Sequence, residues 1–230
     1  MCPFCSEEVK SSAIKCKHCG SMFGQSDSSD SATLNPDAQI RQALGDRYEN
    51  LQFIGSGGMA TVYKAVQKSL GRTVALKVIH QNLIHDKEFV QRFLREAKMS
   101  ASLSHPNIVT VYDTGSVGQV HYIAMEYLQG EDLFQKVKRD GALPPEQVTG
   151  WFAWLAEALD YIHGQGMLHR DIKSSNILIT NTGRPVLMDF GIAHAADGTQ
   201  LTQSGSVLGT PEYMSPEQTE AGDLTPDSDL

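Results

Sequence analysis

The hydrophobic and polar positions between residues 48 and 128 predict a small β-sheet. Five segments have the alternation or the β-branched residues typical of strands, at 48–54, 61–66, 73–79, 108–112 and 121–128. Asp86 can cap a helix between the third and fourth of these strands. The apolar residues expected on one face of that helix are Phe89, Phe93, Ala97 and Leu103. The pattern therefore predicts a mostly antiparallel sheet lobe with one helix.

The second half of the chain shows the longer period of a helix. Pro144 and Pro145 are typical of a helix start, and glycines end the apolar run at Gly164 and Gly166. The apolar residues between them, at helical spacing, are Val148, Trp151, Phe152, Leu155, Leu159 and Ile162. Short strands are expected at 177–179 and 186–188. A sheet lobe followed by a helical region predicts an α+β fold.

The first 45 residues differ in composition from the rest. All four cysteines lie within residues 1–24, and residues 25–45 are rich in Ser and Asp. Such a polar segment buries too little apolar surface to fold by itself, so we expect a flexible linker, to which residues 38–45 could add a short helix. This division predicts a Cys-rich module, a linker and one large domain over residues 46–230.

The four cysteines form two CxxC pairs, a spacing that predicts a structural zinc site. Cys2 and Cys5 form one pair, and Cys16 and Cys19 the other. Four thiolates complete a tetrahedral zinc shell and leave no open position for catalysis. Two disulfides or a redox CxxC are the alternatives, but neither a signal peptide nor a thioredoxin-like pattern accompanies the cysteines. His18 is expected to be a spacer. We expect a short zinc ribbon that folds only with its metal and contacts a protein partner.

Composition and charge exclude several classes of protein. The chain has 40% hydrophobic and 20% charged residues, as globular domains do. Its net charge of -8 argues against sequence-independent binding of nucleic acid. No apolar run approaches the roughly 18–20 residues of a membrane helix, and residues 1–24 lack the apolar stretch of a signal peptide. We therefore expect a cytoplasmic protein.

Candidate catalytic groups gather in two short loops of the second half. The sequence HRDIKSSN at 169–176 carries a carboxylate, a lysine and an amide, and Asp189 follows in an Asp-Phe-Gly sequence. Carboxylate and amide oxygens are ligands that Mg²⁺ prefers, and a carboxylate can accept the proton of a hydroxyl. This set predicts transfer of a nucleotide γ-phosphate to a hydroxyl.

Three upstream features predict the nucleotide-binding side. The glycine-rich sequence IGSGGMATV at 54–62 lies between two predicted strands, where its backbone N–H groups can approach phosphates. Lys77 can reach the same phosphates, and Glu96 on the following helix can hold the lysine. Each residue alone has an ordinary explanation, a solvated strand lysine or a surface helix acid. Their joint occurrence with the two loops favours the nucleotide site.

Taken in order, these motifs resemble the eukaryotic-like Ser/Thr protein kinases, especially the bacterial ones. Eight elements follow the family order over residues 48–230: the glycine-rich loop, VALK at 74–77, REA at 95–97, HPNIV at 105–109, MEYL at 125–128, HRDIKSSN, DFG and GTPEYMSPE at 209–217. The resemblance implies a two-lobed, protein-kinase-like fold with an antiparallel β N-lobe and an incomplete helical C-lobe. It also implies ATP and Mg²⁺ as cofactors and proteins as substrates.

The same resemblance assigns roles to individual residues. Asp171 would orient the substrate hydroxyl and accept its proton, and Lys173 would stabilise the transferred phosphate. Lys77 and Glu96 would form an ion pair, and Asn176 and Asp189 would bind magnesium. The residues expected to contact ATP are Ile54, Gly55, Ser56, Gly57, Gly58, Met59, Ala60, Thr61, Val62, Ala75, Lys77, Met125, Glu126, Leu128 and Leu178. Ala60 stands where glycine is commonest in the family, a small change that should be tolerated.

The segment from Asp189 to Glu217 carries candidate regulatory and specificity residues. Thr202 and Ser204 fall where bacterial relatives autophosphorylate, and a phosphate there could pair with Arg170. A solvated polar loop is the alternative. Thr210, with Lys173, is typical of Ser/Thr specificity.

The resemblance also places the last residues at the start of the central helix of the kinase C-lobe. Asp229 would begin that helix and brace the HRD backbone. We expect a truncated kinase domain and favour a fragment of a longer kinase. The alternative is a short product that is catalytically defective and serves as an ATP-binding or scaffolding module.

Overall fold

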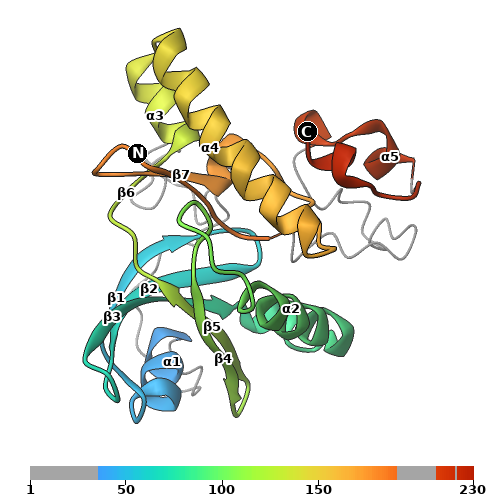
Figure 1. The fold of residues 1–230 in the computed structure, drawn as a ribbon. Coiled ribbons are helices and arrows are strands. Elements are labelled where there is room, and N and C mark those ends of the chain that lie inside the picture. The colour runs from blue at the N-terminus through green and yellow to red at the C-terminus, as the bar shows by residue number, and fades with distance from the viewer. Residues whose placement is uncertain (1–35, 191–210, 221) are drawn as a thin grey trace, which may run out of the picture. The chain divides into compact units, whose positions relative to one another are not determined.

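The computed structural model describes residues 36–190, 211–220 and 222–230 (Figure 1). Eight residues singled out in the sequence lie outside the described residues: Cys2, Cys5, Cys16, His18, Cys19, Thr202, Ser204 and Thr210. Within the described ranges, no helix combines the length and the apolar character needed to cross a membrane.

Five antiparallel strands form the sheet of the first lobe (Figure 1). They are β1 (Tyr48–Ser56), β2 (Ala60–Gln67), β3 (Arg72–Ile79), β4 (Val111–Val117) and β5 (Val120–Glu126), in the spatial order β1-β2-β3-β5-β4. The predicted sheet lobe is therefore confirmed, although its fourth strand is not where the sequence placed it. Ile108 and Val109 are buried, but Val109 N–H donates to Leu187 O, 2.9 Å away, in the second sheet. The strand predicted at 108–112 begins only at Val111 for this reason.

The central strand β3 is buried on both faces because a helix lies on each side of the sheet. Its six residues from Val74 to Ile79 are all buried. Val74, Leu76 and Val78 pack in one apolar cluster, and Ala75 and Ile79 pack in another on the opposite face. This alternation follows from the period of two along a strand.

Helix α2 (Lys87–Ser100) covers the face of Ala75 and Ile79. The Asp86 carboxylate accepts a hydrogen bond from Phe89 N–H, 2.9 Å away, so the predicted cap is confirmed. Phe89, Phe93 and Ala97 are buried against the sheet. Leu103 was expected on the same helical face, but the helix ends at Ser100 and Leu103 packs in the core of the second lobe.

Helix α1 (Pro36–Leu44) covers the other face of the sheet. The sequence indicates that residues 38–45 could form a short helix. Ile40 and Leu44 are buried in the cluster that contains Tyr63 and Leu76. Tyr63 Oη donates to Asp37 Oδ1, 2.5 Å away. Residues 36–44 therefore pack as part of the same compact unit as the sheet, which runs from Pro36 to Leu230.

The second lobe combines helices with a small three-stranded sheet. Its elements are β6 (Gly130–Asp132), α3 (Leu133–Asp140), α4 (Pro145–Gly164), β7 (Ile177–Thr180), β8 (Pro185–Leu187) and α5 (Pro216–Thr219). Single turns of 3₁₀ helix lie at Ser174–Asn176, Pro211–Tyr213 and Pro226–Asp229, and another, Gln81–Leu83, lies between β3 and α2. The predicted helix start at the prolines and the two predicted short strands are confirmed.

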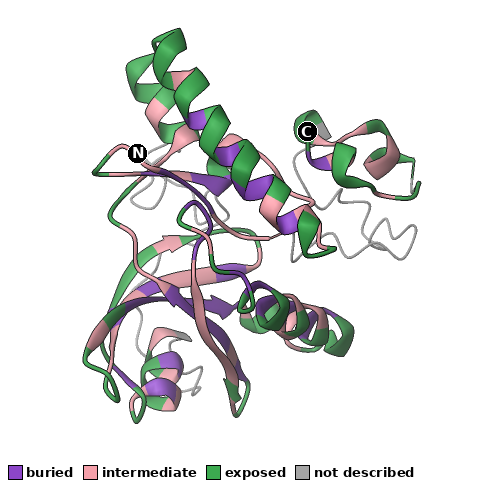
Figure 2. Cartoon of the chain, in the orientation of Figure 1, coloured by how far each residue is buried: buried purple, intermediate pink, exposed green. Residues whose placement is uncertain are grey.

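Helix α4 buries one side along its length and exposes the other (Figure 2). Trp151, Leu155, Leu159 and Ile162 lie on the buried side. Phe152 belongs to the same apolar run but is 62% exposed, because it lies about 100° around the helix from Trp151.

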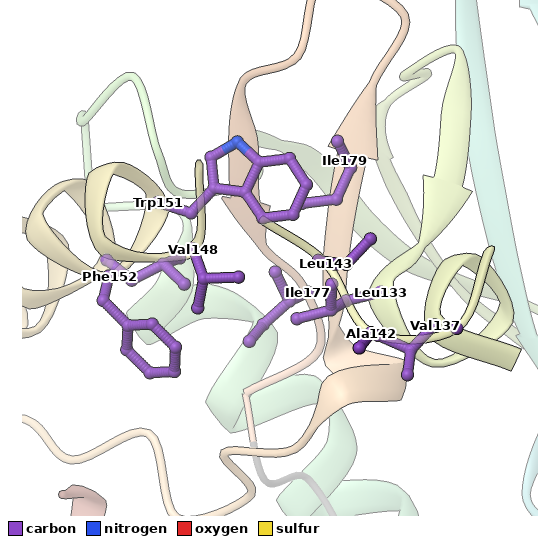
Figure 3. Close-up of a pocket in the computed structure, with 11 residues that line it drawn as sticks. Leu133, Val137, Ala142, Leu143, Val148, Trp151, Phe152, Ile177 and Ile179 are labelled. Carbon is purple, nitrogen blue, oxygen red and sulfur yellow. The ribbon is translucent and has the colours of Figure 1, made fainter. Parts of the chain in front are cut away.

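An apolar pocket of about 170 Å³ lies where α3, α4 and β7 meet (Figure 3). Its lining includes Val137, Val148, Trp151 and Ile177 and contains no ionisable side chain. Acid–base or phosphoryl chemistry therefore has to be sought elsewhere in the fold.

We expect α1 to contribute to the stability of the sheet lobe. Leu44 is fully buried, so Leu44→Ala should lower the free energy of unfolding by about 2–5 kcal/mol through lost burial and a residual cavity. Gln42→Ala, at an exposed position of the same helix, is the matched control and should change it little. Urea unfolding of the two variants measures the difference, and equal stabilities would show that α1 is dispensable.

Candidate active site

The loop between α4 and β7 carries the HRD sequence and is held by a carboxylate from the end of the chain. Asp229 Oδ2 accepts a hydrogen bond from His169 N–H at 2.8 Å, and Asp229 Oδ1 accepts one from Arg170 N–H at 2.7 Å. His163 Nε2 of α4 lies 2.9 Å from the same carboxylate, whose side chain is 1% exposed. The predicted bracing of the HRD backbone by Asp229 is thus present.

The same bonds support an unusual backbone conformation. Arg170 has a φ of 67°, in the left-handed region that residues other than glycine seldom adopt. Such a conformation persists where the surrounding contacts enforce it. Two of those contacts are direct hydrogen bonds. Arg170 N–H donates to the Asp229 carboxylate, and Gln218 Nε2 donates to Arg170 O at 2.9 Å. The orientation of the next residue, Asp171, depends on this turn.

Two predicted catalytic residues and one predicted magnesium ligand meet around the Asp171 carboxylate. Asn176 Nδ2 donates to Asp171 Oδ2 at 2.7 Å and to Asp171 O at 2.9 Å. Lys173 Nζ lies 2.9 Å from the same Oδ2. Because the Asn176 amide donates through nitrogen, its oxygen is left as an acceptor for another group.

The position of Asp189 relative to Asn176 is set by backbone contacts. Met188 N–H donates to Asn176 O at 2.8 Å, and Met188 O lies 2.9 Å from His169 Nε2. Asp189 follows with a φ of 42°. Within the described ranges, no group of three or more His, Cys, Asp or Glu side chains could hold a metal. The candidate magnesium ligands are instead one carboxylate and one amide.

Lys77 forms an ion pair, but with Asp189 and not with the predicted Glu96. Its Nζ lies 2.6 Å from Asp189 Oδ1, and the lysine is buried whereas the aspartate is partly exposed. Among the described residues, no ion pair joins Lys77 to Glu96. In the structure, Lys77 of β3 therefore contacts the Asp-Phe-Gly loop directly, and Glu96 of α2 takes no part in this ion pair.

Glu96 lies in a separate pocket of about 180 Å³ between α2 and the HRD loop. The pocket is also lined by Met99, Arg170 and Phe190, and Phe190 packs on His169 with ring centroids 4.8 Å apart. Glu96 Oε2 is buried and has no hydrogen-bond partner. Burial raises the pKa of Glu96 to about 7, although nearby arginines, Arg170 foremost, act to lower it.

The glycine-rich loop forms the hairpin between β1 and β2. Ser56 and Thr61 are opposite each other, and Gly57 N–H donates to Ala60 O at 2.9 Å. An added Cβ at Gly55 or Gly58 would meet no atom within 4 Å, so the space beside the loop is open.

The remaining residues expected to contact ATP come from both lobes. Ala75 and Met125 are buried in one apolar cluster, with Val62 and Leu128 packed against it. The backbone of Glu126 at the end of β5 donates to Thr110 O at 2.8 Å. Leu178 lies on β7, paired with Val186. Their contacts with nucleotide stay predictions.

Sequence reasoning missed two residues that contact the predicted site. Gln218 accepts a hydrogen bond from Ser215 N–H at 2.9 Å while it donates to Arg170 O. His80 contacts Ser56 and Thr61 of the glycine-rich loop. Residues 48 and 24 apart come together in these contacts, and no local pattern indicates such pairs. Only the glutamine had a signal, the SPEQ sequence typical of a helix N-terminus.

Known proteins resemble this chain in sequence and in fold. A family model for the protein kinase domain matches residues 48–230. The chain is 45% identical over 192 residues to the serine/threonine-protein kinase PknB of Mycobacterium leprae, covering 81% of this chain and 31% of that protein. It is 41% identical over 191 residues to the serine/threonine-protein kinase PrkC of Bacillus subtilis, covering 83% of this chain and 30% of that protein.

A solved structure agrees with these relatives. The crystal structure of the Mycobacterium tuberculosis PknI kinase domain matches with a TM-score of 0.63 and 32% identity, over 79% of this chain and 70% of that one. The chain thus spans less than a third of the length of the two relatives above and most of a solved kinase domain. On this evidence the chain belongs to the protein kinase domain family.

Proposed function

We propose that this chain carries the catalytic centre of a protein serine/threonine kinase, which transfers the γ-phosphate of ATP to Ser and Thr hydroxyls of proteins. The observation that carries the proposal is the convergence of Lys173 and Asn176 on Asp171. Asp189, already paired with Lys77, is held beside them. The alternative, a defective ATP-binding or scaffolding module, would keep the nucleotide site without transfer.

The residues divide the chemistry between them. The glycine-rich loop and Lys77 would bind the phosphates, since backbone N–H groups and an ammonium both attract them. Asp171 would orient the acceptor hydroxyl and take its proton. Lys173, 2.9 Å from that carboxylate, would stabilise the negative charge that develops on the transferred group.

Asn176 and Asp189 fit magnesium by the chemistry of their donor atoms. The Asn176 amide oxygen and the partly exposed Asp189 carboxylate are hard oxygen ligands. The backbone hydrogen bond from Met188 N–H to the Asn176 carbonyl oxygen keeps Asn176 close to Asp189, the residue after Met188. When bound, magnesium would neutralise and orient the phosphates.

A phosphotransfer assay tests the proposal. With radiolabelled ATP, Mg²⁺ and myelin basic protein, Asp171→Asn should lower transfer by about 10²–10⁴-fold, because general-base catalysis contributes that much. Asp160→Asn, an exposed acid on α4, is the matched control and should keep the activity. Full activity in Asp171→Asn would contradict the role of this residue. ATP binding without transfer in the wild-type chain would favour the scaffolding alternative.

We also propose autophosphorylation at Thr202 and Ser204, which lie in the segment that follows the Asp-Phe-Gly loop. Arg170 is the candidate partner for such a phosphate, and its Nε is buried without a hydrogen-bond partner. Mass spectrometry of the chain after the same assay locates the phosphate. Phosphate found only at other residues would exclude these two.

Nucleotide binding would change the partner of Lys77. Asp189 would give up its pair with Lys77 when it binds magnesium, and Glu96 on α2 is the carboxylate that could then hold the lysine. The cost of leaving the Glu96 Oε2 buried without a hydrogen-bond partner favours such a move whenever the side chain is ionised.

Glu96 makes the stability of the nucleotide-free chain depend on pH. Its pKa is raised from 4.5 to about 7, so between these values the folded chain binds a proton that the unfolded chain releases. Stability therefore falls as pH rises through this window. Glu96→Gln removes the ionisable group, so its melting temperature should exceed that of wild type at pH 8 and match it near pH 4.5. Its phosphotransfer should fall, because an amide cannot pair with Lys77.

The matched control is Glu88→Gln, at an exposed acid of the same helix that pairs with Arg92. This variant should follow the wild-type melting curve at every pH. An equal difference between Glu96→Gln and wild type at both pH values would show that Glu96 does not titrate in this window.

We further propose that Cys2, Cys5, Cys16 and Cys19 bind one structural zinc ion in a ribbon that contacts a protein partner. Their CxxC spacing supports this. Metal analysis of the purified full chain should give about one zinc per chain, and replacing Cys16 and Cys19 by Ser should abolish it while His18→Ala keeps it. Two disulfides in a zinc-free chain would contradict the proposal. The cytoplasmic location stays a prediction.

A further inference from the structure

His80 contacts both strands of the glycine-rich hairpin. It follows β3 directly, and its Nε2 lies 3.1 Å from Thr61 Oγ1 and 3.3 Å from Ser56 Oγ. Ser56 ends β1, and Thr61 faces it from β2 as its cross-strand partner. One ring nitrogen therefore lies against two hydroxyls that belong to opposite sides of the loop.

The backbone of the same residue adds a second attachment. His80 N–H donates to Met59 O at 3.0 Å. This bond does not involve the imidazole, so a substitution of His80 removes the contacts of the ring and leaves the backbone bond in place. The contribution of the ring can be measured separately for that reason.

The ring is better suited to position the loop than to attract phosphate by charge. Burial lowers the pKa of His80, and the backbone of Gly58 only partly offsets this. The imidazole is therefore mainly neutral at neutral pH. A neutral ring can exchange hydrogen bonds with the Ser56 and Thr61 hydroxyls.

The loop has few other contacts that would restrict it. Ser56, Gly57 and Gly58 are exposed, and a Cβ on Gly58 would meet no atom within 4 Å. Glycine also has more backbone freedom to lose than any other residue. Holding both sides of the hairpin in advance lowers the entropy that must be lost when a ligand orders the loop.

We propose that His80 is a positioning residue that holds the glycine-rich loop in the geometry that binds the phosphates of ATP. This role rests on the proposed kinase function, because the loop has this task only in a nucleotide-binding protein. The imidazole acts through Ser56 and Thr61 and does not touch the reacting atoms.

Two substitutions and a matched control separate this role from a structural one. His80→Phe keeps an aromatic ring but removes its nitrogen atoms. His80→Gln replaces the ring with an amide that can still form hydrogen bonds with the two hydroxyls. His121→Phe is the control, because His121 is also partly buried in the same sheet and bonds a serine, with Nδ1 2.7 Å from Ser116 Oγ. That pair lies in the β4–β5 hairpin, away from the glycine-rich loop.

Steady-state kinetics of the full chain give the first readout. His80→Phe should raise KM for ATP about two- to tenfold, as expected for one or two hydrogen bonds, with a smaller effect on kcat. His80→Gln should recover most of the affinity, and His121→Phe should leave KM unchanged. Equal KM values for wild type and His80→Phe would overturn the proposal while leaving the kinase function intact.

Hydrogen exchange of the nucleotide-free chain gives a readout that needs no activity. In His80→Phe, peptides covering 54–61 should exchange faster, above all at the Gly57 amide bonded to Ala60 O, while melting temperature confirms that the variant is folded. Unchanged exchange in this segment would show that the ring does not hold the loop. A wild-type chain that neither binds ATP nor transfers phosphate would instead overturn the kinase function, and the role of His80 with it.

Discussion

The buried carboxylate of Asp229 holds the loop on which the proposed chemistry depends. A buried charge is costly unless hydrogen bonds satisfy it, and Asp229 receives them from the backbone of His169 and Arg170 and lies beside His163. These bonds keep Arg170 in its left-handed conformation, which in turn directs Asp171. Residues 59 or more positions apart are thereby joined into one site.

The remaining groups are organised from this loop outward. Asn176 and Lys173 bond the Asp171 carboxylate, and the backbone of Asn176 holds the strand end that leads to Asp189. Asp189 then reaches Lys77 on β3. The Lys77–Asp189 ion pair joins the two lobes, together with the backbone bond from Val109 to Leu187. Glu96 lies apart from this chain of contacts, in a pocket with Arg170.

Sequence reasoning succeeded where local chemistry decides the structure. The Asp86 cap, the Pro145 helix start and the β-branched residues of β3 are local signals, and the structure has all three elements. The contacts among Asp171, Lys173 and Asn176 could be expected because these residues are close in sequence. The partner of Lys77 could not be predicted, because Glu96 and Asp189 are both carboxylates and only the position of α2 decides between them. The strand predicted at 108–112 was misplaced for a similar reason. Ile108 and Val109 are apolar, but only the position of the second sheet decides that Val109 bonds Leu187.

A crystal structure of the chain with Mg²⁺ and a non-hydrolysable ATP analogue tests the central claim most directly. We expect the phosphates between the glycine-rich loop and Lys77, with magnesium bound by the Asn176 amide oxygen and the Asp189 carboxylate. The terminal phosphate should face Asp171 and Lys173. A nucleotide bound elsewhere at saturating concentration, or magnesium held by other side chains, would contradict the account.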